Sequence, residues 1–239
     1  MYQERFYRDW TKSAYKLEAA YKESDLLIFS DKGLSRSRVL ALAQQYYCQI
    51  EAYALLNPAF STALSPIDED PGAQAIIQDM IRGAWVAGVG PFACVAGAVA
   101  AYVGQELLKE SNEIIVENGG DIFLRLTSPK RVGVYLGEGF SPDTLVLNIE
   151  PRLEPFGIAS SSAKLGPSLS FGRADMVTVI ATDAIVADGF ATAIGNKIKT
   201  AADAEPVMEL FKDNPLIQGI LVAVEGKIFM WGEMQVAEQ

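Results

Sequence analysis

Within residues 174–196 the spacing of apolar residues changes from that of a strand to that of a helix. A β-branched run at residues 177–180 is typical of a buried strand, whereas the apolar residues after position 183 recur with the period of a helix. Thr182 or Asp183, between the two patterns, is expected to cap the helix. We therefore expect a strand followed directly by a helix, with the rest of the chain organised around this pair.

The remaining pattern predicts a mixture of helices and strands with no sharp change in composition. Strands are expected at residues 15–21, 25–30, 113–117, 121–127, 131–136, 144–149, 157–162, 217–224 and 227–231, and helices at residues 34–56, 92–109 and 204–212. The four strands between residues 113 and 149 are expected to form one antiparallel meander. Residues 151–155 are expected to be a linker, and residues 61–72 a surface loop. The pattern predicts an α+β fold and a single domain spanning residues 1–239.

One stretch, residues 85–104, contains no charged residue and has the length of a transmembrane helix. Gly88–Pro91 interrupts it, and most of its residues are Ala or Gly, whose transfer into a membrane is only weakly favourable. We therefore expect two buried helices here, and no membrane partner. Gly88 and Gly90 either allow close packing or expose backbone N–H groups to an anion, and the sequence leaves both open.

The chain carries 30 acidic and 20 basic residues, a formal net charge of −10. This balance argues against binding to nucleic acid or to anionic membranes, both of which rely on basic surfaces. The absence of histidine excludes Ser-His-Asp and Cys-His catalysis and His-bearing zinc sites. Cys48 and Cys94 have no metal-ligand spacing, and the N-terminal residues do not form a signal peptide. We expect a cytoplasmic protein with reduced thiols.

Asp188 and Thr192 are the first candidates for chemistry, because they lie four residues apart on the expected helix and project from one face. A carboxylate and a hydroxyl held beside a sheet suit a hard cation such as Mg²⁺, which leaves room for substrate phosphates. The alternative is a solvated Asp and a Thr that bonds back to its own helix. The spacing does not decide between the two.

Two polar stretches are candidates for ligand binding. Asn118-Gly119-Gly120-Asp121 lies between two expected strands and is either a plain hairpin turn or a place where the backbone approaches a ligand. The loop that begins at Ser160, Ser161 and Ser162 contains hydroxyls and Lys164, which favour contact with a phosphate-bearing ligand. An S-x-x-K pattern from Ser161 to Lys164 is too short to indicate an acyl-transfer serine.

Four segments in the same order resemble the ApbE-like proteins: AGVGPFACVAGAVA (87–100), VENGGDI (116–122), GIASSS…LGPSLSFGRAD (157–175) and VTVIATDAIVADGFATAIGN (177–196). The closer likeness is to their compact, uncharacterised cytosolic branch, and the more distant one is to ApbE, the FAD:protein FMN transferase. The resemblance implies antiparallel sheets backed by helices, related to the T-fold. This agrees with the α+β fold predicted from periodicity.

The resemblance also implies site residues. In the transferases an Asp and a Thr in a motif similar to ADGFATAI hold Mg²⁺, and Asp188 and Thr192 match them. FAD lies near an N-x-G-G-D motif, of which Gly119, Gly120 and Asp121 match. The Asn of that motif falls at Glu117, and Asn118 stands one place later. The candidate flavin-binding residues are therefore Gly119, Gly120 and Asp121, which the resemblance implies, together with Asn118 beside them and Ser160, Ser161 and Ser162 of the polar loop.

The chain also departs from the family pattern. Where the compact branch has a histidine and a glycine in SSGTVGHSLSFG, this chain has Pro167 and Ala163. A transferase stretch resembling VDLGGIAKGYAVD, which would supply a carbonyl ligand, is missing. Chemistry that needs the histidine is not expected here.

Two functional hypotheses follow. The first is a protein that binds FAD or another phosphate-bearing nucleotide with Mg²⁺ and carries out FMN transfer or pyrophosphate cleavage. The second is a non-catalytic ligand-binding or assembly protein that kept the fold and lost the transferase site. An enzyme acting on some other phosphorylated metabolite is a third, weaker alternative. The Ala/Gly-rich helices suit close subunit packing and predict a homo-oligomer.

Overall fold

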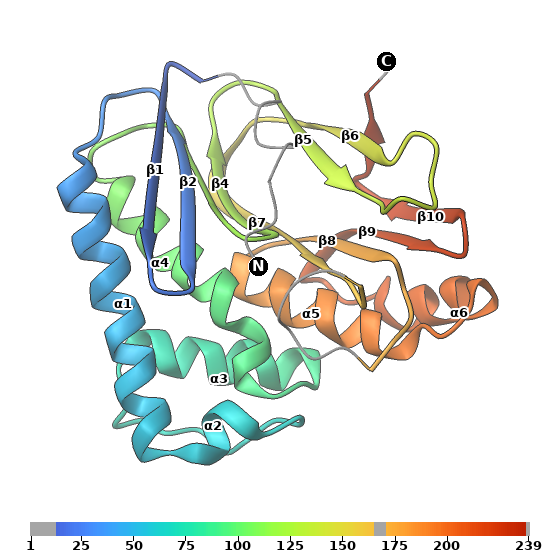
Figure 1. The fold of residues 1–239 in the computed structure, drawn as a ribbon, viewed down its shortest axis with the longest axis horizontal. Helices are drawn as coiled ribbons and strands as arrows, with labels where there is room; N and C mark the ends of the chain where they lie inside the picture. Colours follow the sequence, from blue (N-terminus) through green and yellow to red (C-terminus); the bar gives the residue numbers. More distant parts are fainter. Residues whose placement is uncertain (1–12, 165–170, 238–239) are drawn as a thin grey trace.

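The computed structural model describes residues 13–164 and 171–237 (Figure 1). Its strands are β1 Tyr15–Tyr21, β2 Ser24–Ser30, β3 Ile114–Asn118, β4 Asp121–Leu126, β5 Lys130–Tyr135, β6 Thr144–Ile149, β7 Arg152–Ser161, β8 Met176–Ala181, β9 Ile217–Val224, β10 Lys227–Gly232 and β11 Gln235–Val236. Its helices are α1 Arg36–Leu56, α2 Pro58–Thr62, α3 Ala75–Ala87, the 3₁₀ helix η2 Pro91–Cys94, α4 Val95–Leu107, α5 Ala184–Lys197 and α6 Ala201–Phe211.

An eight-stranded sheet in the order β1-β2-β3-β4-β7-β8-β9-β10 forms the middle layer, and every neighbouring pair in it is antiparallel. Helices cover one face, and a small sheet in the order β11-β6-β5 covers the other (Figure 1). Successive residues of β4 show the division: Phe123 packs into the helix-side core, and Leu124 into the core beneath the small sheet. The α+β prediction is confirmed.

The change of period near residue 183 is confirmed as a junction between β8 and α5. All six residues of β8 are buried. Asp183 caps α5, because its Oδ1 accepts hydrogen bonds from the backbone N–H groups of Ile185 at 2.7 Å and Val186 at 3.4 Å. A Cβ at Gly157 of β7 would overlap the backbone of Ala184. The start of α5 therefore lies directly against the sheet.

The uncharged stretch after residue 83 forms two helices, as predicted. Gly88, with φ of 74°, ends α3 in the left-handed conformation, and Pro91 begins η2. In the part of the chain that the structure describes, no single helix is long and apolar enough to cross a membrane. The pair formed by α3 and residues 91–107 meets that criterion by length and composition only, and it is bent by 104°.

The predicted four-strand meander is wrong. β3 and β4 belong to the large sheet, whereas β5 and β6 pair with each other and with β11 in the small one. The cause is the one-sided apolar pattern of β5 and β6. Their residues Val132, Val134 and Leu147 are buried face to face against the large sheet, in a core with Leu124 and Phe156.

Several predicted boundaries are also wrong. Of residues 151–155, predicted to be a linker, residues 152–155 begin β7. The β4–β7 ladder tolerates Pro155 because its register shifts between Leu124 and Leu126. Helix α6 starts earlier than predicted because Thr200 and Asp203 form a capping box. Residues 61 and 62, assigned to a loop, end the short helix α2.

Candidate functional site

Asp188 lies in the middle of α5 and faces the N-terminus of α4. Its Oδ2 accepts a hydrogen bond from the Gly97 N–H at 2.9 Å, and the N–H of Ala96 also donates to its carboxylate. The residue at the N-cap position of α4, Cys94, supplies no side-chain cap. Asp188 therefore caps α4 from a neighbouring helix and lies at the positive end of its dipole.

Gly97 allows this contact. A Cβ at Gly97 would overlap the Ala184 carbonyl oxygen and would lie 2.9 Å from the Cβ of Asp188. The Ala/Gly-rich composition of α4 thus brings two helices together closely enough for a backbone N–H to reach a carboxylate. The sequence predicts close packing along this stretch, but it does not indicate that Gly97 and Asp188 form the contact.

Asp121, the first residue of β4, supplies a second buried carboxylate. It has the same orientation as Phe123 on the helix side of the sheet, and it is buried. Its Oδ1 is buried with no hydrogen-bond partner. Burial and the charge of Asp188 raise the pKa of Asp121 well above its ordinary value. Burial likewise raises the pKa of Asp188 to about 7, against the effect of the two backbone donors.

These two carboxylates repel each other in a site from which water is largely removed, so a divalent cation would stabilise both as anions. The orphaned Oδ1 of Asp121 is the observation that fits a hard cation, which prefers carboxylate oxygens. Thr192 is one turn further along α5 and is half-buried. Among the residues that the structure describes, no three His, Cys, Asp or Glu side chains form a metal cluster. The other ligands would therefore be hydroxyl, carbonyl, phosphate or water oxygens.

The Asn118–Asp121 stretch forms a two-residue hairpin turn between β3 and β4, with Gly119 at φ of 73°. Asn118 donates from Nδ2 to the Ala96 carbonyl oxygen at 3.2 Å, and its Oδ1 accepts from the Asp25 N–H at 3.3 Å. Its amide thus joins the turn to the start of α4. Gly120 lies against the carbonyl oxygen of Ser160 on β7, where a Cβ would be 3.0 Å from that oxygen.

The structure separates the three predicted serines. Ser161 faces the helices, since a Cβ at Gly195 of α5 would lie 3.7 Å from its Oγ. Ser160 points to the opposite face of the sheet, where its Oγ lies 2.9 Å from the Oγ1 of Thr178. Ser162 Oγ accepts a hydrogen bond from the Lys164 N–H at 3.1 Å, and the Lys164 ammonium pairs with Asp175.

The geometry thus places Asn118, Asp121, Ser161 and Asp188 on one side of the sheet and Ser160 on the other. Pro167, which stands at the place of the family histidine, lies outside the described residues.

Cys94, which the sequence did not assign to the site, lies close to these residues. Its Sγ is 3.1 Å from the position that a Cβ at Gly189 would take. Burial, and then the charges of Asp188 and Asp121, raise the pKa of this thiol well above its ordinary value. Because the thiol stays protonated at neutral pH, Cys94 packs between helices and does not act as a nucleophile.

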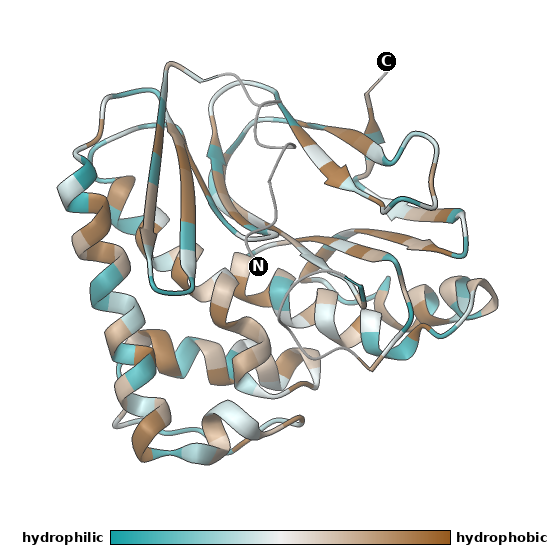
Figure 2. Cartoon of the chain, in the orientation of Figure 1, coloured by the Kyte–Doolittle hydropathy of each residue, from teal (hydrophilic) through white to brown (hydrophobic). Residues whose placement is uncertain are grey.

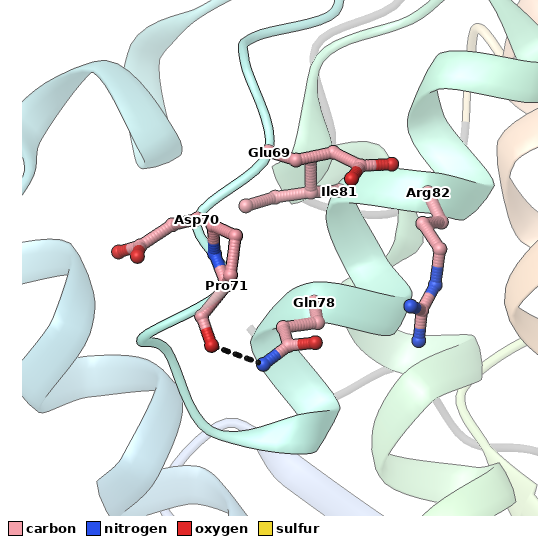
Figure 3. A pocket seen from close by; sticks show the side chains of 6 residues that line it. All are labelled: Glu69, Asp70, Pro71, Gln78, Ile81 and Arg82. Atoms are coloured by element: carbon pink, nitrogen blue, oxygen red, sulfur yellow. Dashed lines mark hydrogen bonds between the residues drawn. The ribbon is translucent and has the colours of Figure 1, made fainter.

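Two hollows lie on other parts of the molecule. Figure 3 shows the first, which is lined by Glu69, Asp70 and Pro71 of the loop before α3 and by Gln78, Ile81 and Arg82 of α3. Gln78 Nε2 donates to the Pro71 carbonyl oxygen at 3.1 Å across this hollow. The second lies between α6 and β10. Neither is lined by a predicted site residue.

Comparison with known proteins decides the family. A family model described as AbpE bacteria matches residues 8–229. The chain belongs to this ApbE-like family. Its curated relatives include a UPF0280 protein of Archaeoglobus fulgidus, 35% identical over 219 residues and covering 90% of each chain. Another, from Methanocaldococcus jannaschii, is 34% identical over 227 residues, covering 92% of this chain and 91% of the relative.

Solved structures of ApbE proteins share the fold. The flavin transferase ApbE from Vibrio cholerae aligns over 93% of this chain and 97% of its own, with a TM-score of 0.63 and 13% identity. The apo form of the flavinyl transferase ApbE from Pseudomonas stutzeri aligns over 96% of both chains, with a TM-score of 0.64 and 12% identity. At this identity the likeness shows an ApbE fold and not an activity.

Proposed function

We propose that this protein binds FAD, or a closely related pyrophosphate-bearing nucleotide, together with Mg²⁺ at Asp121 and Asp188. The observation that carries the proposal is the orphaned Oδ1 of Asp121 on the same side of the sheet as the Asp188 carboxylate. Without a cation the buried pair has to stay protonated or carry the cost of two like charges out of water, and Oδ1 of Asp121 has no hydrogen-bond partner. A cation removes this cost and creates a site for an anionic ligand.

The protein's own residues have separate roles in this proposal. The Gly97 N–H fixes the Asp188 carboxylate so that it does not rearrange when the cation binds. Asp121 contributes the second carboxylate, and the Thr192 hydroxyl a neutral oxygen one turn along α5. Ser161, at the helix-facing end of β7, is placed to donate to a ligand phosphate.

Asn118 holds the turn in place by its hydrogen bond to the Ala96 carbonyl oxygen at the start of α4. Gly119 and Gly120 leave the turn without side chains, so the backbone can approach the ligand.

The reaction we propose is opening of the FAD pyrophosphate, with the FMN phosphoryl group passing to a hydroxyl or to water and AMP leaving. When bound, Mg²⁺ would neutralise the pyrophosphate and stabilise the charge that develops as the phosphoryl bond opens. The chain has no histidine, and the Cys94 thiol stays protonated. The attacking hydroxyl must therefore lose its proton to a carboxylate or to solvent. The cytoplasm, where thiols stay reduced, is the proposed location.

Calorimetric titration with FAD, with and without Mg²⁺, tests the binding step. Wild-type protein and Asp213→Asn, which removes an exposed carboxylate at the end of α6, should bind FAD only with Mg²⁺. Asp188→Asn should lose most of this binding. Affinity that survives chelation of the metal, or is unchanged in Asp188→Asn, would overturn the proposed site.

A non-catalytic binding or assembly role is the second candidate, and the missing histidine favours it. Chromatography of FAD incubated with protein and Mg²⁺ separates the two roles. Release of AMP that Asp188→Asn abolishes supports the enzyme, whereas Mg²⁺-dependent binding without turnover supports the second candidate.

A further inference from the structure

One end of the molecule is built from two segments of the chain that carry no charged side chain. Residues 52–67 and 83–105 contain no Asp, Glu, Lys or Arg. They meet where the Phe60 and Phe92 rings lie 6.2 Å apart, edge to face, and where a Cβ at Gly90 would overlap the Ala63 carbonyl oxygen. We call the surface of α2, the loop to residue 67, the ends of α1 and α3, and η2 the uncharged end (Figure 1).

Large apolar side chains are exposed across the uncharged end: Leu55, Leu56, Leu64, Trp85, Val86 and Phe92. Leu56 is 83% exposed and Trp85 67% exposed. Figure 2 shows the apolar colour at the lower end of α1, next to α2. Large apolar side chains that gather at one end of a molecule, without charged neighbours, mark an interaction surface.

Side-chain contacts beneath the uncharged end join its elements to one another. Phe60 is fully buried beneath it, and the Tyr53 ring packs edge to face on Phe60 at 5.0 Å. The Tyr53 hydroxyl donates to Asp70 at 2.8 Å, which ties α1 to the loop before α3. These contacts hold the backbone that carries the exposed side chains.

Charge decides which partner fits. A lipid surface binds proteins through apolar side chains flanked by Lys and Arg, and the uncharged end has no basic residue, on a chain of net charge −10. The same net charge makes two copies repel each other over most of their surface. The uncharged end is where two copies can approach without bringing like charges into contact.

We infer that the uncharged end is the interface of a homodimer, in which the same surface of each copy packs around a two-fold axis. Trp85, the one exposed tryptophan among these residues at 67% exposure, is the expected anchor residue. Charged residues that flank the two segments in the chain, Glu51, Asp68 and Arg82, would form the polar rim. The inference does not rest on the proposed flavin site.

Sedimentation and light scattering of the full chain, from about 1 to about 100 µM, test this interface. Wild type is expected to be a dimer. Trp85→Glu and Leu56→Glu should each weaken association by ~100-fold or more, because a buried charge at the anchor would have no partner. Leu210→Glu is the matched control, since Leu210 is 72% exposed on α6, away from the uncharged end.

Circular dichroism tests whether each variant is folded. Because two independent variants are used, the test stays valid if one of them does not fold. A monomeric wild type over the whole range would overturn the inference, as would dimers of Trp85→Glu and Leu56→Glu as stable as those of Leu210→Glu. A monomer that floats with neutral phosphatidylcholine vesicles would assign the uncharged end to lipid instead.

Discussion

The Gly97 N–H donates a 2.9 Å hydrogen bond to Oδ2 of Asp188, a residue 91 positions away in the chain. This bond joins the first turn of α4 to the middle of α5. It favours the ionised carboxylate, while burial favours the protonated one. The candidate site therefore contains a carboxylate whose protonation is balanced near neutral pH.

Gly97→Ala should destabilise the fold. The added methyl would overlap the Ala184 carbonyl oxygen, so α4 and α5 must separate, at an expected cost of about 1–3 kcal/mol in the free energy of unfolding. Urea denaturation followed by circular dichroism measures this cost. Gly139→Ala is the control, because nothing lies within 4 Å of the added Cβ, and it should change stability by less than about 0.5 kcal/mol. Equal effects of the two substitutions would contradict the packing seen at Gly97.

Asp188→Asn should change how stability depends on pH in the absence of metal. The folded pKa of Asp188 is about 7, above the value near 3.9 expected in the unfolded chain. Between these values the folded state binds more protons than the unfolded state. The contribution of this group to stability is complete below about pH 4 and is lost as pH rises to about 7. Asparagine does not titrate, so the variant should gain in melting temperature relative to wild type between about pH 5 and about pH 8. Melting curves with EDTA that stay parallel over this range would contradict the assignment.

Mg²⁺ should stabilise the wild-type protein. At a free concentration of about 100 times the dissociation constant, a ligand that binds only the folded state adds about 2.7 kcal/mol. For a chain of this size that corresponds to a rise in melting temperature of roughly 5–10 °C. Asp121→Asn and Asp188→Asn should lose this rise, and Asp213→Asn should keep it. A rise of equal size in all four proteins would indicate a general salt effect.

Two neighbouring serines should respond differently to substitution by alanine. Ser161 faces α5, so Ser161→Ala should weaken FAD binding by roughly 2- to 10-fold, the contribution of one hydrogen bond. Ser160 is bonded to Thr178 on the other face, so Ser160→Ala should cost about 1 kcal/mol of stability and leave FAD affinity unchanged. Calorimetry and denaturation on both variants measure the two effects. The reverse pattern would place the ligand on the side of the small sheet.

The features predicted correctly from sequence are those set by neighbouring residues. The β8–α5 junction depends on a β-branched run, a capping Asp183 and a helical repeat, all within one stretch. The hairpins of β1 with β2 and of β9 with β10 depend on local turns. The split into two sheets depends on which face each strand buries after the chain has folded back, and local pattern does not contain that information.

The same limit applies to the candidate site. Asp188 and Asp121 were found from motifs, but the donors that hold Asp188 come from the backbone of Ala96 and Gly97, which no side-chain pattern indicates. Asn118 was assigned to a ligand, and the structure places its amide between Asp25 and Ala96. Alternation along β7 distinguishes Ser160 from Ser161, but only once the register with β4 and β8 is known.

The place where the small sheet joins the large one has an engineering consequence. β4 and β7 are neighbours in the large sheet. Between them the chain leaves this sheet, forms β5 and β6 of the small sheet, and then returns. The loop at residues 137–143 joins two strands of the small sheet, whereas Asp121 and Ser161 lie on strands of the large sheet. Residues 141–143 at the end of this loop are exposed. A fluorescent reporter could be inserted into this loop without changing the length of any segment that shapes the site, because surface loops of this kind accept insertions. The loop between β5 and β6 thus offers a position for a fluorescent label that leaves the candidate site unchanged.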